Sequence, residues 1–177
     1  MTEKIIIAGS GGQGIMLLGK ILATAAMQEN KHVTWLPSYG AEVRGGTSHC
    51  MVIISDAPIG SPYISKADTL IMMNRPSLEK FKQRIKDKGL LILNSSLADE
   101  ELNCRAEILK YPFSDIAIKL GNIRVANVVA LGCYLAKKKI VGLKTAQRVI
   151  AQMAPADKKH LIEINQAALS SGRRLSL

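Results

Sequence analysis

The 177-residue chain is 47% hydrophobic and 21% charged, which is an ordinary balance for one globular domain. Aromatic residues make up only 4%, so an aliphatic core is expected. The formal net charge of +10 favours an acidic partner or a phosphorylated ligand. The basic residues form small groups without interleaved aromatics or a nucleic-acid-reading motif, so we expect solvated helix faces and no nucleic-acid partner.

The three cysteines, Cys50, Cys104 and Cys133, are far apart in the sequence and form no CxxC pair. This spacing argues against a disulfide framework and against a zinc or iron–sulfur site within the chain. We expect three small buried residues in a reducing compartment. No signal peptide is visible, and no apolar stretch reaches the roughly 18 residues of a membrane span, so the expected location is the cytoplasm, without a membrane partner.

The first half of the chain alternates strands with helices. Apolar runs predict buried strands, and apolar residues at helical spacing predict helices. The predicted strands are 4–8, 32–36, 48–55, 69–73 and 90–94, and the predicted helices are 15–30 and an exposed basic helix at 77–88.

The second half is predicted to be helical. The expected helices are 114–120, ending at Gly121; 123–137, which is apolar almost all round; 143–153; and 157–171, ending at Gly172. Together the elements predict an α/β fold: a Rossmann-like, mostly parallel sheet with helices on both faces and a helical C-terminal part. We expect residues 1–177 to form a single domain, since no repeat or long linker interrupts them.

A glycine-rich turn directly follows the first strand. Its residues are Gly9, Ser10, Gly11, Gly12, Gln13 and Gly14, and they satisfy the GxGxxG pattern between a predicted strand and a predicted helix. Glycines allow the tight turn, and the N–H groups at the start of the following helix favour an anion. The pattern is equally compatible with glycines that only let helix and strand pack closely. Gln13 is placed to cap the turn, touch a ligand or meet a partner.

The dinucleotide-binding version of this turn needs an acidic residue about 20 positions further on, at the end of the second strand. Here that strand ends in Trp35-Leu36-Pro37-Ser38, and the nearest acids, Glu29 and Glu42, lie before the strand and within the next loop. The sequence therefore disfavours ordinary NAD binding.

A second polar, glycine-rich segment follows the second strand, on the edge where open α/β sheets place their ligands. It runs Tyr-Gly-Ala-Glu-Val-Arg-Gly-Gly-Thr-Ser over residues 39–48. Arg44 offers a planar fork for a carboxylate or phosphate, and Glu42 is placed to hold that fork. The alternative is a surface turn with a solvated ion pair.

Three stretches of the sequence carry a family resemblance: GSGGQG on the first turn, YGAEVRGGTSHCMVIIS after the second strand, and LGNIRVANVVALG at 120–132. Together they resemble the γ subunit, or domain III, of the 2-oxoacid:ferredoxin oxidoreductases. The resemblance runs over nearly the whole chain and includes INQAALSSG at 164–172, but residues 95–113 do not align clearly.

The resemblance implies a subunit of an enzyme that oxidatively decarboxylates a 2-oxoacid, such as 2-oxoglutarate or pyruvate, to an acyl-CoA. The complex passes the electrons to ferredoxin. Other subunits would hold the cofactors, which are thiamine diphosphate, magnesium and [4Fe–4S] clusters. These subunits are α and β and, where one is present, a ferredoxin-like δ subunit. The resemblance implies that the γ chain supports assembly and shapes the side of the active site that CoA approaches.

No residue of this chain is predicted to be catalytic. The resemblance implies that the first turn and Arg44 contact the cofactor, with loop or interface support from Tyr39, Glu42, Gly45, Gly46, Ser48 and Asn127. A buried asparagine is costly unless its amide is bonded, so we expect Asn127 to bond backbone or a partner loop. Two other classes stay open: a stand-alone nucleotide-binding oxidoreductase, and a non-enzymatic binding module.

Overall fold

The computed structural model describes residues 1–38, 47–154 and 160–176. Its strands are β1 Thr2–Ser10, β2 His32–Ser38, β3 Thr47–Ser55, β4 Ala67–Met72, β5 Ile85–Asn94 and β6 Glu107–Tyr111. Its α-helices are α1 Ile15–Gln28, α2 Arg75–Phe81, α3 Phe113–Lys119, α4 Ala126–Lys138, α5 Leu143–Met153 and α6 His160–Arg174. Two short 3-10 turns, Lys82–Arg84 and Ile123–Val125, precede β5 and α4.

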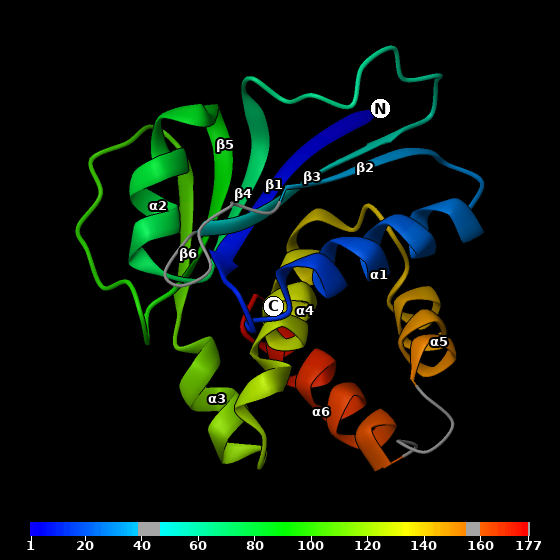
Figure 1. Ribbon diagram of the computed structural model, residues 1–177, viewed down its shortest axis with the longest axis vertical. Coiled ribbons are helices and arrows are strands. Elements are labelled where there is room, and N and C mark those ends of the chain that lie inside the picture. Colours follow the sequence, from blue (N-terminus) through cyan, green and yellow to red (C-terminus); the bar gives the residue numbers. More distant parts are fainter. Residues whose placement is uncertain (39–46, 155–159, 177) are drawn as a thin grey trace.

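The six strands form one sheet in the order β2-β3-β1-β4-β5-β6 (Figure 1). The pairings β1–β4, β4–β5 and β5–β6 are parallel, whereas β3 runs antiparallel to both β1 and β2. The fold is therefore the α/β class that the alternation of strands and helices predicts. The antiparallel β3 follows from its connection, because β2 and β3 are adjacent and joined by a short segment.

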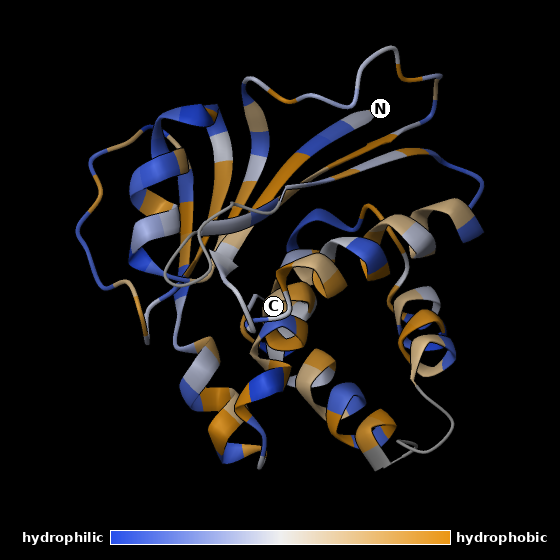
Figure 2. Ribbon diagram, viewed as in Figure 1, coloured by the Kyte–Doolittle hydropathy of each residue, from blue (hydrophilic) through white to orange (hydrophobic). Residues whose placement is uncertain are grey.

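Each face of the sheet is covered by its own layer. Successive residues of β1 point to opposite faces, so Ile5 and Ile7 pack with α1 and α4, while Ile6 and Ala8 pack under α2. Figure 1 shows α1 and α4–α6 gathered on one side of the sheet, and Figure 2 shows apolar residues running along the strands between the layers. Both layers exclude water from the central strands, which makes β1 and its following turn a rigid support.

The apolar helix predicted at 123–137 is buried within this chain. The helix α4 has ten consecutive buried residues, Ala126 to Leu135, and packs against α6, α3 and α1. Its all-round apolar pattern is thus explained by neighbours in the same chain.

Several predicted boundaries differ from the observed ones; the strand predicted at 90–94, for example, is only the second half of β5. The basic helix predicted at 77–88 begins at Arg75, because the side chain of Asn74 caps it by accepting from the N–H of Ser77, and it ends at Phe81. Residues from Ile85 onwards join the sheet instead, where Ile85 pairs with Ala67 of β4. Strand β6 is absent from the prediction, because it is a short edge strand that pairs on one side only.

The predicted C-terminal end of the last helix is also wrong, since α6 continues through Gly172 to Arg174. Gly172 is therefore a helix-interior residue and not a cap. The prediction for Gly121 is confirmed: it follows α3 with a φ of +96°, the left-handed conformation of a helix-ending glycine.

Candidate functional site

The glycine turn lies at the switch point of the sheet. From β1 the chain runs through α1 to β2, towards one edge, whereas from β4 it runs through α2 to β5, towards the other. Since β1 and β4 are neighbours, the chain leaves their carboxyl ends in opposite directions. Open α/β sheets bind ligands in the crevice that opens at such a point.

The turn is closed by its own glutamine. The N–H of Ser10 donates to Oε1 of Gln13 at 2.7 Å, and the N–H of Gln13 donates to the carbonyl of Ser10 at 3.2 Å. Nε2 of Gln13 also donates to the carbonyl of Met73, at 3.4 Å, just beyond β4. Of the three roles left open by the sequence, the capping of the turn is thus the one the structure shows. Gln13 also ties the turn to the neighbouring strand.

The glycines of the turn divide into two kinds. A Cβ on Gly9 would meet Oε1 of Gln13 at 2.6 Å and Cδ1 of Ile15 at 2.7 Å, and one on Gly14 would collide with the amide of Asn127. Those two glycines serve close packing. Gly11 and Gly12 are exposed, and a Cβ on either would meet no atom within 4 Å. Packing therefore does not explain these two, although the φ of +86° favours glycine at Gly12.

Asn127 holds the turn from the opposite layer. Its Nδ2 donates to the carbonyl of Gly14 at 3.0 Å, and its Oδ1 accepts from the N–H of Val128 at 2.9 Å. The prediction that this buried amide bonds backbone is confirmed. The contact fixes the start of α1 against the first turn of α4.

Two further asparagines, which the sequence reasoning missed, follow β4 and end β5. Nδ2 of Asn74 donates to Oγ of Ser10 at 2.5 Å, and Nδ2 of Asn94 donates to the carbonyl of Met73 at 3.2 Å. Asn94 also bonds Ser114 at the start of α3. Both follow buried apolar runs directly, in Met-Met-Asn and Leu-Ile-Leu-Asn, and that position is the signal that could have found them. These amides give the carboxyl edge a continuous polar rim.

The second predicted segment is only partly described. Tyr39, Glu42, Arg44, Gly45 and Gly46 lie outside the described residues. The residues that flank the segment do show where it starts and ends, because Ser38 pairs with His49 while Thr47 and Ser48 pair with Ser10 and Gly9. Both ends of the segment thus lie at the carboxyl edge, beside the glycine turn.

Glu29, one of the two acids nearest to the end of the second strand, is committed to another contact. Glu29 is at the far end of α1, where its Oε1 accepts from the N–H of Gly142 at 2.8 Å and so holds the start of α5. It is committed to joining two helices and is a full helix length away from the turn. Glu42, the other nearby acid, lies outside the described residues, so among the two acids the structure places only Glu29, away from the turn.

His49 on β3 lies at this edge in a positive environment. Its ring centroid is 4.8 Å from that of Phe81, and its pKa is lowered first by burial and then by the charges of Lys80 and Arg84. The folded protein therefore favours neutral His49. Protonation favours the unfolded chain, whose histidine keeps its ordinary pKa near 6.5.

We expect His49 to make the protein less stable as the pH falls through 6.5 towards the lowered pKa of the folded state. Above pH 6.5 the contribution should be constant. Thermal unfolding of the wild type and of His49→Gln between pH 5 and 8 measures this contribution. The stability of the variant should fall less than that of the wild type as the pH is lowered. Parallel curves for the two proteins would show that His49 does not titrate differently on folding.

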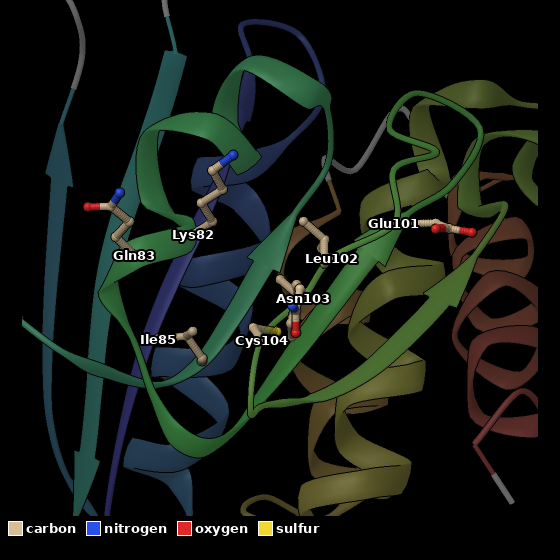
Figure 3. Close-up of a pocket in the computed structure, with 8 residues that line it drawn as sticks. Lys82, Gln83, Ile85, Glu101, Leu102, Asn103 and Cys104 are labelled. Atoms are coloured by element: carbon tan, nitrogen blue, oxygen red, sulfur yellow. The ribbon is translucent and has the colours of Figure 1, made fainter.

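A separate hollow of about 390 Å³ lies on the α2 face, away from the glycine turn. Residues of the 3-10 turn, β5 and the segment before β6 line it: Lys82, Gln83, Ile85, Leu91, Glu101, Leu102, Asn103 and Cys104 (Figure 3). Cys104 is exposed there, so the prediction of three buried cysteines is wrong for this one. The reason is that Cys104 precedes the edge strand β6, where no described element covers it.

The three thiols should differ sharply in reactivity. Burial raises the pKa of Cys50 to about 12 and also raises the pKa of Cys133, whereas Cys104 is exposed. A thiolate is the reacting species, so a disulfide reagent at pH 8 should label Cys104 within minutes and the other two only after unfolding. Cys104→Ser should abolish the fast phase. A fast phase that survives in this variant would contradict the burial of the other two thiols.

Among the described residues, no three His, Cys, Asp or Glu side chains come together as a group that could hold a metal ion. Over the same residues, no helix is long and apolar enough to cross a membrane. The fold and site define the chain as an open α/β protein with a glycine turn at its switch point.

The chain belongs to the pyruvate ferredoxin/flavodoxin oxidoreductase family, whose model matches residues 4–175. It is 36% identical over 178 residues to the 2-oxoglutarate synthase subunit KorC of Methanocaldococcus jannaschii, covering 97% of this chain and 92% of that one. It is 37% identical over 170 residues to the ketoisovalerate oxidoreductase subunit VorA of Methanothermobacter thermautotrophicus. That match covers 96% of this chain but only 35% of VorA, so the chain spans about a third of that relative's length.

The fold agrees with a solved member of the family. The keto/oxoacid ferredoxin oxidoreductase γ subunit of Geobacter sulfurreducens superimposes with a TM-score of 0.86 at 29% identity, covering 98% of both chains. The family resemblance carried by the three sequence stretches is thereby confirmed.

Proposed function

We propose that this chain is the γ-type subunit of a 2-oxoacid:ferredoxin oxidoreductase, with residues 1–177 acting as one unit. The full-length similarity to KorC and to a γ subunit carries the proposal. The complex would convert a 2-oxoacid and CoA into an acyl-CoA and carbon dioxide, and the electrons released would reduce ferredoxin. The names of the relatives include both 2-oxoglutarate and ketoisovalerate enzymes, so the proposal is made for the class of 2-oxoacids.

In this proposal the redox and decarboxylation chemistry belongs to the α and β subunits, and to a δ subunit where one is present. Those chains would hold thiamine diphosphate, magnesium and the [4Fe–4S] clusters. A [4Fe–4S] cluster takes four thiolates, whereas this chain has three cysteines, of which Cys50 and Cys133 are buried and Cys104 faces a separate hollow. The residues present therefore do not fit a cluster of this chain's own.

The carboxyl edge is the part of this chain that we assign to CoA. Gly11 and Gly12 are exposed with open space beside them, which lets a phosphate approach the backbone closely. Gly9, Ser10, Gln13 and Gly14 shape and fix the turn through the contacts described above. Phosphate groups suit such a turn because backbone N–H groups donate to them.

The second segment would complete this side of the active site. We propose that Arg44 contacts the anionic part of CoA, and that Tyr39, Glu42, Gly45, Gly46 and Ser48 support the loop or meet the partner subunit. The described flanks of the segment support this, since Ser48 pairs with Gly9 at the edge of the glycine turn.

Tagging the chain in its native host and purifying it gently under anaerobic conditions tests the assignment. Mass spectrometry should find companion chains that bear a thiamine diphosphate site and cysteine-rich cluster motifs, and an untagged strain controls for background. Recovery of the chain without such companions would contradict the proposed function. The alternative of a stand-alone enzyme would then be tested by NAD(P)H binding.

A further inference from the structure

Lys80 reaches across the end of β1. It lies on α2, which follows β4 on one side of β1, but its Nζ donates to Oγ1 of Thr47 at 3.0 Å, and Thr47 begins β3 on the other side. Thr47 in turn pairs with Ser10, the second residue of the glycine turn. The ammonium group is therefore held at the carboxyl edge, on the α2 face of the crevice.

The charge of Lys80 is uncompensated within the described part of the chain. Its helix neighbours are paired, since Lys82 bonds Glu79 at 2.6 Å and Arg75 bonds Glu100 at 2.5 Å. For Lys80, no described carboxylate lies within ion-pair distance; its other contact is the ring of Phe81, 5.7 Å from Nζ to the centroid. Lys80 is exposed, and its contacts are to a hydroxyl and an aromatic ring, so its charge is available to an external anion.

The surrounding groups reinforce this positive potential. Arg84 stacks between the rings of Tyr63 and Phe81, at 5.3 and 5.6 Å, and its Nε donates to the carbonyl of Ser65. No described carboxylate pairs with Arg84 either. Two cations, Lys80 and Arg84, thus lie around the ring of Phe81. Their charges help to lower the pKa of the neighbouring His49 and so disfavour its protonation.

The glycine turn, which begins beside Thr47, offers neutral donors. Gly11 and Gly12 expose their backbone, and Ser10 accepts from Asn74 through Oγ, which leaves its own hydroxyl hydrogen available to donate. A phosphate bound at this edge could receive hydrogen bonds from the backbone and hydroxyl of the turn and from the ammonium of Lys80, because Thr47 links the two. Lysine is a common phosphate ligand because its ammonium acts as a compact point charge.

We propose that Lys80 is a phosphate-binding residue of the crevice, which contacts a phosphate group of CoA opposite the exposed glycines of the turn. This inference rests on the proposed function for the identity of the ligand. Lys80 belongs to the basic group at 80–88, whose sequence pattern alone predicts only a solvated helix face.

Calorimetric titration of the purified full chain with CoA at low ionic strength tests the proposal. Lys80→Gln should weaken binding about tenfold, as expected for the loss of one charge-assisted hydrogen bond. Lys82→Gln is the matched control, because Lys82 lies two residues away and is paired with Glu79; it should bind within about twofold of the wild type. Lys80→Arg should recover part of the affinity.

A second readout separates ligand binding from a structural role. Bound phosphate next to Lys80 should raise the pKa of His49, followed by its ring resonances in NMR, in the wild type but much less in Lys80→Gln. Equal thermal unfolding of the two proteins would show that the Thr47 contact is not needed for folding.

Absence of CoA binding by the wild-type chain, or equal affinities for Lys80→Gln and Lys82→Gln, would overturn the proposal. Neither result bears on the companion chains found by purification. A result that overturns the role of Lys80 is therefore distinguishable from one that overturns the proposed function.

Discussion

Gly172→Ala should destabilise the folded chain by about 1–3 kcal/mol or more, which is the usual cost of overpacking a tight core. In α6 a Cβ at this position would collide with the carbonyl of Val129 in α4. The contact is reciprocal, because a Cβ on Gly132 of α4 would collide with the carbonyl of Leu169 in α6. The two helices pack backbone against backbone at this crossing, and neither carbonyl can move without breaking helical hydrogen bonds.

Helix propensity predicts the opposite sign, since alanine is about 1 kcal/mol better than glycine inside a helix. The measurement therefore decides which effect is larger. Denaturant unfolding of Gly172→Ala, Gly132→Ala and the control Gly60→Ala should show losses for the first two only, since a Cβ on Gly60 meets no atom within 4 Å. Higher stability of both helix variants would mean that α4 and α6 do not cross this closely.

Asn127→Ala should cost about 2–3 kcal/mol and should also disturb the glycine turn. The side chain is 1% exposed and bonds both the carbonyl of Gly14 and the N–H of Val128. The carbonyl of Gly14 still accepts from the N–H of Leu18, at 2.9 Å, so α1 should persist while its starting point loosens.

Two measurements check this prediction. The melting temperature should fall by several degrees, and amide exchange at Gly11 to Ile15 should become faster than in the wild type. Asn103→Ala, at the exposed rim of the separate hollow, is the matched control and should change neither. Unchanged exchange at the turn in Asn127→Ala would show that α4 does not hold it in place.

Local patterns predicted much of the fold. The β-branched run before Gly9 and the helical spacing after it gave β1 and α1, and the helix at 143–153 was predicted with its observed bounds. Patterns failed where tertiary packing decided the outcome. A glycine at position 172 is typical of a helix end. Only the packing against α4 shows that a glycine is needed there within the helix, because a side chain would collide with the backbone of α4.

The residues of the candidate site likewise divide into those that a local sequence pattern predicts and those that it does not. The glycine turn was visible in the sequence, because its chemistry lies within six consecutive residues. Asn74, Asn94 and Lys80 were not, because their partners are 21 to 64 positions away and are brought together by the order of the strands. The contact between Lys80 and Thr47 depends on β3 lying next to β1, which no local pattern encodes.

The most direct test of the central claim is the activity of the complex with and without this chain. The companion chains should be prepared alone and recombined with the wild-type chain, and viologen reduction should be followed with a 2-oxoacid and CoA. The account predicts that CoA-dependent reduction requires the chain, and that the chain alone gives none. Full CoA-dependent activity of the companion chains without it, or turnover of a 2-oxoacid by this chain alone, would contradict the account.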